Sequence, residues 1–211
     1  MKTSLKGILA IINEEALVLS TYRDAGGVLT IGVGHTAAAG GMAPKVGGRI
    51  TVEQAIALLA VDLAKFERRV LAAVKRTLKQ HEFDALVSFD FNTGAIAGGT
   101  VDDRLARGDI AGAMATLQQY DKAAGRKLAG LERRRDSEEA MFRHGTYPAT
   151  TSIKVYDTWP GKLHLVPVSS LDLSAFATPS EIPARPRGLL AALIDLLLAI
   201  FKRRSGQRPT R

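Results

Sequence analysis

The spacing of apolar residues changes several times along the first part of the chain. Residues 4–20 place an apolar side chain at every third or fourth position, which predicts an amphipathic helix. Residues 22–35 then contain a Gly-Gly turn between β-type residues, which predicts a β-hairpin. Residues 36–50 are rich in glycine and contain Pro44, so we expect a loop before the next regular element.

Helical spacing returns after this loop and continues through the middle of the chain. Thr51 is a typical N-cap residue with Glu53 and Gln54 in the first turn, and it predicts a helix that runs to about residue 79. Further helices are predicted over residues 81–91, 100–107, 109–120 and 131–143. A small hairpin beside a mainly helical lobe predicts an α+β fold.

The last third of the chain follows a different pattern. Residues 151–168 alternate around Pro160-Gly161, which predicts a second small hairpin, and the prolines that follow predict a stiff linker. Residues 188–201 are almost entirely apolar and are followed by basic residues. We therefore divide the chain into a body over residues 1–147, a hairpin and Pro-rich linker over 148–187, and an apolar helix with a basic tail over 188–211.

The apolar helix admits three interpretations. As a helix its 14 residues span about 21 Å, less than the roughly 30 Å of a hydrocarbon core. The flanking basic residues favour contact of residues 188–204 with an anionic membrane surface. Packing on the body or self-association is the second interpretation, and a short anchor is the third.

Composition and charge narrow the classes of function. The 211 residues carry a formal net charge of +8, which favours polyanionic partners, and they contain no cysteine, which excludes thiolate metal sites and cysteine nucleophiles. The four histidines are too far apart for an HExxH-type site, so we expect neither a metal nor a cofactor. The plausible stacking partners for bases in the tail, Trp159 and Phe201, do not lie in a basic stripe, so no nucleic-acid partner is expected. The apolar run over residues 7–12 is too short for a signal peptide.

Three residues at the predicted junction of helix and hairpin stand out chemically: Glu15, Asp24 and Thr30. Cleavage of a glycosidic bond needs one protonated carboxyl to donate to the leaving oxygen and one ionised carboxylate. The hydroxyl of Thr30 could hold the attacking water. Spacing alone also fits two solvated surface acids, so the triplet needs further support.

The sequence around this triplet resembles the signature of the phage-type lysozymes, the T-even and lambdoid-phage endolysin family. Eight residues separate Glu15 from Asp24, five separate Asp24 from Thr30, and the segment Thr30-Ile31-Gly32-Val33-Gly34-His35 follows the family pattern. Residues 83–94 resemble the central helix of the family, and residues 130–142 resemble its closing helix. The resemblance covers about residues 5–147. It departs from the family at Ala16, where glycine is usual.

The resemblance implies a lysozyme-like fold and hydrolysis of the β-1,4 bond between N-acetylmuramic acid and N-acetylglucosamine. Glu15 is then the general acid, Asp24 the base or electrostatic partner of a water, and Thr30 the residue that positions this water. Substrate contacts are implied at three positions and structural support of the site at three more. These are Gly34, Phe91 and Asn92 for the substrate, and His35, Asp62 and Arg134 for support.

In this interpretation His35 pairs with Asp62, and Arg134 approaches Glu15 as a buried cation. Arg133 and Arg135, by contrast, are expected on a solvated helix face.

The sequence as a whole predicts a monomeric endolysin-type muramidase that binds peptidoglycan and causes cell lysis. It is expected to be made in the host cytoplasm and to act on the periplasmic cell wall, with export through a holin or assisted by its own tail. The alternative is a non-catalytic peptidoglycan-binding or membrane-permeabilising protein on a lysozyme-like fold.

Overall fold

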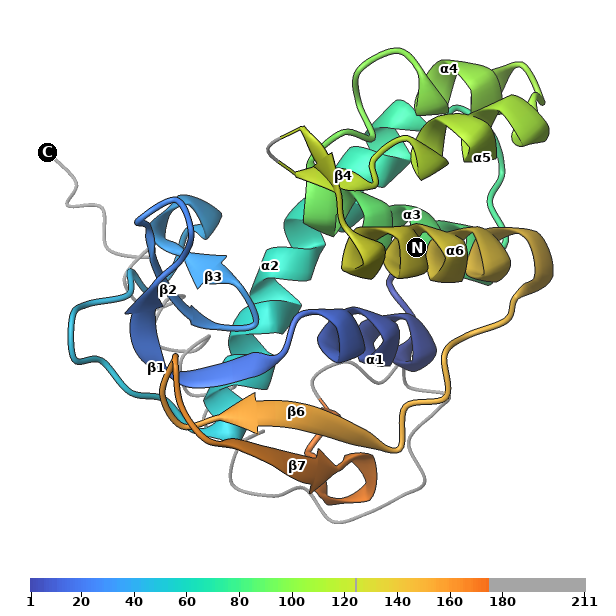
Figure 1. Ribbon diagram of the computed structural model, residues 1–211. Helices are drawn as coiled ribbons and strands as arrows, with labels where there is room; N and C mark the ends of the chain where they lie inside the picture. The colour runs from blue at the N-terminus through green and yellow to red at the C-terminus, as the bar shows by residue number, and fades with distance from the viewer. Residues whose placement is uncertain (124, 175–211) are drawn as a thin grey trace, which may run out of the picture. The chain divides into compact units, whose positions relative to one another are not determined.

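The computed structural model describes residues 1–123 and 125–174 of the chain (Figure 1). The predicted Pro-rich linker and the apolar helix at residues 188–201 lie outside the described residues. Strands and helices are mixed, as the predicted α+β class requires. In Figure 1 the strands of the two predicted hairpins lie at the left and bottom, and the helices within residues 80–144 lie at the upper right.

The first helix is shorter than its apolar pattern predicts. α1 spans Leu5–Glu14. Its N-cap residue is Ser4, whose hydroxyl accepts a hydrogen bond from the backbone N–H of Gly7 at 3.2 Å. The prediction of a helix to residue 20 was wrong, because the chain turns at Ala16, which has a φ of +29°. The remaining apolar residues of that segment belong to the first strand instead.

Five strands form one sheet in the order β3-β2-β1-β6-β7. β1, β2 and β3 are antiparallel and form the predicted hairpin with one short extra strand. β6 and β7 form a second antiparallel hairpin, and β6 pairs with β1 in parallel. The bounds are Leu17–Arg23 for β1, Leu29–Gly32 for β2, His35–Thr36 for β3, Ser152–Tyr156 for β6 and Leu163–Pro167 for β7.

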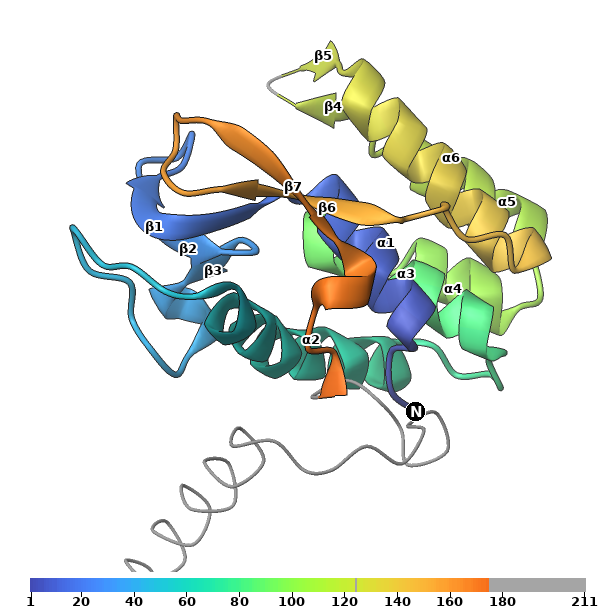
Figure 2. The same ribbon diagram turned by 90° about the horizontal axis from the view of Figure 1, so that it is seen from below.

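The long helix α2, Val52–Ala73, connects the strands to the other helices (Figure 2). Thr51 is its N-cap, as predicted, and forms a reciprocal capping box with Gln54. The helix ends at Ala73, before the predicted residue 79, and the backbone of Val74 is already extended.

α3 and three further helices make up the rest of the helical lobe. The side chains of α3 from Phe83 to Asp90 are buried, so this helix forms the centre of the lobe. The bounds are Gln80–Thr93 for α3, Val101–Ala106 for α4, Ile110–Gln118 for α5 and Ala129–His144 for α6. Short elements that the sequence did not predict are η1, Ala37–Ala39, η2, Val168–Ser170, and the strand pair β4, Lys122–Ala123, with β5, Arg126–Lys127.

Among the residues described, every helix is too short or too polar to cross a lipid bilayer.

Candidate active site

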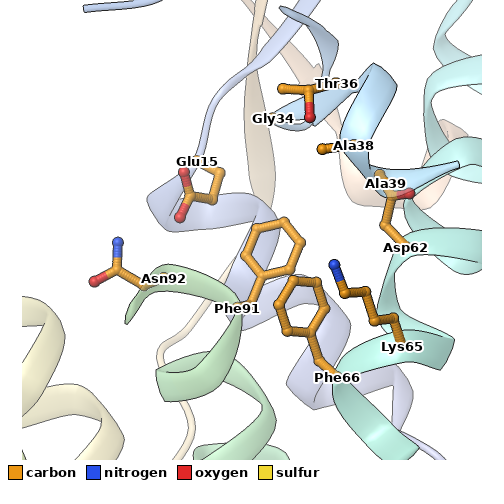
Figure 3. Close-up of a pocket in the computed structure, with 10 residues that line it drawn as sticks. All are labelled: Glu15, Gly34, Thr36, Ala38, Ala39, Asp62, Lys65, Phe66, Phe91 and Asn92. Carbon is orange, nitrogen blue, oxygen red and sulfur yellow. The ribbon is translucent and has the colours of Figure 1, made fainter. Parts of the chain in front are cut away.

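A cleft of about 260 Å³ lies where the end of α1, the β3 region, α2 and α3 approach one another (Figure 3). We call this space the cleft. In Figure 3 Glu15 and Asn92 lie close together on one side, and the rings of Phe91 and Phe66 lie between them and Lys65. The residues that line the cleft are Glu15, Gly34, Thr36, Ala38, Ala39, Asp62, Lys65, Phe66, Phe91 and Asn92.

Glu15 sits at the C-terminal end of α1, and its carboxylate accepts a hydrogen bond from the Nη1 of Arg134. The side chain of Arg134 is only 5% exposed, whereas that of Glu15 is 27% exposed. The guanidinium also contacts Glu138 at 3.2 Å and the carbonyl of Ser88 at 3.3 Å. Burial alone would lower the pKa of Arg134, but Glu15 and Glu138 raise it overall, so a fixed positive charge lies behind Glu15.

Asp24 is held by the turn of the first hairpin. Its Oδ1 accepts hydrogen bonds from the backbone N–H groups of Gly26 at 2.8 Å and Val28 at 2.9 Å. Its Oδ2 lies 3.5 Å from the hydroxyl of Thr30, which also lies 3.1 Å from the carbonyl oxygen of Val28. One carboxylate oxygen therefore fixes the turn, and the other faces the threonine.

Tyr22 links the two carboxylates electrostatically. Burial and the negative charges of Asp24 and Glu15 raise the pKa of Tyr22. The negative charges of both carboxylates therefore reach the same phenol.

His35 and Asp62 are brought together as expected. The Nδ1 of His35 lies 2.9 Å from the Oδ2 of Asp62, and both side chains are buried. The Nε2 lies 2.6 Å from the carbonyl oxygen of Met42, which can only accept, so Nε2 carries a hydrogen. Burial raises the pKa of Asp62, and the contact with His35 opposes that shift. The pair fastens β3 to α2 beside the cleft, and the hydrogen bond to Met42 holds the following loop to the same ring.

Gly34 lies on the cleft wall with a φ of +72°. An added Cβ would meet no atom within 4 Å, so backbone conformation rather than crowding requires glycine here.

Several lining residues were missed by sequence reasoning. Lys65 and Phe66 belong to α2, and the apolar pattern assigned Phe66 to the core. Its ring contacts Phe91 edge-on with centroids 5.0 Å apart, so it faces both the core and the cleft. Thr36 belongs to β3, and Ala38 and Ala39 belong to the short helix η1; neither element carries a sequence signal for substrate contact.

Arg135 contradicts the predicted solvated helix face, because its side chain is fully buried. Its Nε lies 2.9 Å from the Oε2 of Glu138, and its Nη2 donates to the Oδ1 of Asn92 at 2.9 Å. The physical reason is the burial of Glu138, which is 1% exposed and therefore needs cationic partners. Arg133 is exposed, as predicted.

Comparisons with known proteins agree with this geometry. The model of the phage lysozyme family matches residues 12–138. An endolysin of Salmonella phage P22 is 37% identical over 144 residues, which cover 67% of this chain and 98% of the relative. A SAR-endolysin of Escherichia phage Mu is 35% identical over 136 residues, which cover 63% of this chain and 76% of the relative.

A solved structure leads to the same family. The endolysin from Escherichia coli O157:H7 phage FAHEc1 has a TM-score of 0.63 and 35% identity, and the match covers 71% of this chain and 98% of that one. The lysozyme-like fold and the resemblance are thereby confirmed. The chain belongs to the phage lysozyme family and is a muramidase, a glycoside hydrolase that acts on peptidoglycan.

Proposed function

We propose that Glu15 is the general acid of this muramidase and that Asp24 and Thr30 hold the attacking water. The observation that carries the assignment is the position of Glu15, which faces the cleft with Arg134 fixed behind it. Asp24 and Thr30 lie on the adjoining hairpin with their polar atoms facing each other. Gly34, Phe91 and Asn92 contact the sugars, and His35, Asp62 and Arg134 support the site.

In the proposed reaction Glu15 protonates the glycosidic oxygen between N-acetylmuramic acid and N-acetylglucosamine. As this C–O bond breaks, positive charge develops at the anomeric carbon. Asp24 accepts a proton from a water, or stabilises that charge, while Thr30 orients the water. A bound saccharide covers the exposed part of Glu15 and excludes water from the carboxyl group and the bond to be cleaved.

The role of Glu15 is tested by the substitution Glu15→Gln, which keeps the shape of the side chain but removes the acidic proton. We expect the release of reducing ends from purified Gram-negative peptidoglycan to fall by about 10²–10⁴-fold. The matched control is Glu14→Gln, because Glu14 is the exposed neighbour and should be dispensable. Loss of activity in the control alone would show that Glu14 is the acid. No activity in the unmodified chain would favour a binding role.

We also propose that the chain acts as a monomer on the periplasmic wall and that residues 188–204 contact the anionic membrane surface. The apolar run in this segment has Arg and Lys residues on both sides, and this pattern supports the membrane contact. Synthesis in the host cytoplasm and export through a holin or by means of the tail belong to the same proposal. A SAR-endolysin among the relatives supports export.

Membrane contact is tested by sedimentation with vesicles that contain anionic lipid. The full chain should sediment with these vesicles at low salt, and a chain ending at residue 174 should stay in solution. Equal behaviour of the two chains would contradict the role of the tail. The monomer is tested by light scattering on the full chain.

A further inference from the structure

The second hairpin extends the sheet next to the strand that joins Glu15 to Asp24. β6 pairs in parallel with β1, with Leu17 opposite Val155 and Val18 opposite Tyr156. The family match ends at residue 138, so this hairpin lies outside the matched region. The side chains of this hairpin therefore lie outside the part of the chain that matches the phage lysozyme family.

Three aromatic rings cluster where this hairpin turns back. Trp159 contacts Tyr156 edge-on with ring centroids 4.9 Å apart, and it lies 6.5 Å from the ring of Tyr22. We call Tyr22, Tyr156 and Trp159 the aromatic cluster. Trp159 is 49% exposed, although a tryptophan loses favourable burial energy when it faces water. A half-exposed indole fixed by two neighbouring rings is a preformed apolar surface.

The aromatic cluster is continuous with the catalytic residues. Tyr22 lies on β1, and Asp24 follows it two positions later, just after the strand ends. Burial and the negative charges of Asp24 and Glu15 raise the pKa of the Tyr22 phenol. In the sheet β1 pairs with β6 on one side and with β2 on the other, and β2 pairs with β3, whose Thr36 lines the cleft. Figures 1 and 2 show the turn between β6 and β7 next to the β1–β2 hairpin in both views. The cluster thus lies where β1 pairs with β6, beside the strand that leads from Glu15 to Asp24.

We propose that Trp159, supported by Tyr22 and Tyr156, stacks against a sugar ring of the glycan strand beyond the scissile bond. The ligand class is a pyranose of the N-acetylhexosamine type, because its C–H face matches an exposed aromatic ring and its hydroxyls can reach the phenol of Tyr22. The proposal rests on the proposed function, since the strand must pass Glu15 and Asp24 to reach the cluster. A polymeric substrate supplies sugars on both sides of the cleaved bond.

Binding can be measured separately from hydrolysis because Trp159 is the single tryptophan among the 211 residues. The full chain carrying Glu15→Gln is titrated with soluble glycan strands from peptidoglycan while indole fluorescence is recorded. We expect a saturable change in emission wavelength and protection of the indole from acrylamide quenching. An unchanged signal while calorimetry detects glycan binding overturns the proposal. A signal with anionic vesicles but none with glycan overturns it too.

Kinetics on the otherwise unmodified chain give the second readout. Trp159→Ala should raise KM for long glycan strands by about 2- to 10-fold, the equivalent of one aromatic contact, with kcat unchanged. Trp159→Phe should recover most of the loss. The control Leu165→Ala removes a 62% exposed side chain from the same hairpin and should leave KM unchanged.

The proposal is wrong if Trp159→Ala leaves KM unchanged, or if Leu165→Ala raises KM equally. Both results leave the Glu15 assignment intact, because that assignment depends on kcat in Glu15→Gln.

Discussion

At the scale of single residues, the junction between α1 and β1 depends on an unusual backbone conformation. Glu15 is the C-cap of α1, and the next residue, Ala16, has a φ of +29°. This left-handed region is costly for a residue with a Cβ, by about 1–2 kcal/mol. The proposed catalytic acid is therefore held next to local strain, at the position where the family usually has glycine.

Replacing Ala16 with glycine should relieve this strain. Glycine adopts positive φ freely but gives the unfolded chain more entropy, which offsets about 0.4–1 kcal/mol. For Ala16→Gly we expect a net increase in the free energy of unfolding of about 0.5–1 kcal/mol, measured by urea denaturation. Ala16→Val is the opposite control, since a β-branched side chain tolerates this φ less well. A less stable glycine variant would contradict the strain argument.

Tyr147 is a second residue whose environment has a measurable consequence. Its hydroxyl donates a hydrogen bond to the Oδ2 of Asp84 at 2.6 Å, and Asp84 also accepts from the backbone N–H of Ser4 at 2.9 Å. Burial and the contact with Asp84 raise the pKa of Tyr147. The folded chain therefore keeps this proton at a pH where the unfolded chain loses it. The stabilisation is complete below about pH 10 and is lost as the pH rises towards the folded pKa.

Tyr147→Phe tests this pH dependence. At pH 8 we expect a loss of about 1–2 kcal/mol in the free energy of unfolding, because the hydrogen bond to a carboxylate is removed. At pH 11 the difference from the unmodified chain should be smaller. Urea denaturation at the two pH values measures it. A difference that stays constant or grows with pH would rule out the proposed linkage.

At the scale of elements, α6 places two arginines that stand two positions apart in opposite environments. Arg133 faces solvent, whereas Arg135 is fully buried against Glu138 and stacks over Phe89 at 5.2 Å. Both members of the pair belong to α6, and each also contacts α3, because Glu138 accepts a hydrogen bond from the hydroxyl of Ser88 at 2.7 Å and Arg135 donates to Asn92. Removal of one member of a buried ion pair leaves the other charge without compensation.

Arg135→Met should therefore destabilise the helical lobe by about 3 kcal/mol, at the low end for such pairs because Arg134 still contacts Glu138. The matched control is Arg133→Met, which changes the same charge on the same helix and should cost less than about 0.5 kcal/mol. Urea denaturation of both variants gives the comparison. Similar losses in the two would mean that charge, not burial, determines the effect.

The elements also show what the sequence could and could not predict. Helical spacing and the capping residue Thr51 predicted α2 to α6 within a few residues, because these signals are local. The burial of Arg135 depends on the burial of Glu138. The pairing of β6 with β1 depends on contacts between residues that are far apart in the sequence. Neither leaves a local signal. Glu15, Asp24 and Thr30 were found through a motif, whereas Lys65 and Phe66 carry none.

At the scale of the whole molecule, the second hairpin is part of the packed structure of residues 1–174. Ile153 and Val155 are fully buried in the hydrophobic core, and Tyr147 ties the preceding segment to α3. The predicted boundary of the body at residue 147 can be tested by truncation.

A chain ending at residue 174 should keep full hydrolysis of purified peptidoglycan and an unchanged free energy of unfolding. A chain ending at residue 148 should lose about 3–6 kcal/mol, because burial of Ile153 and Val155 contributes about 1.5–3 kcal/mol each. It should also aggregate, since the edge of β1 is left unpaired. Equal stability of the two chains would support the boundary at 147 as a true domain limit.

The parallel pairing of β1 with β6 also sets the order in which the protein can be completed. Leu17 and Val155, which pair across the sheet, lie near opposite ends of the described chain. A ribosome has synthesised α1 to α6 before β6 emerges. The strand between Glu15 and Asp24 therefore lacks its β6 neighbour throughout most of translation. Such long-range pairing slows folding. The helical lobe is therefore free to fold first, and the five-stranded sheet is complete only after β6 and β7 have left the ribosome.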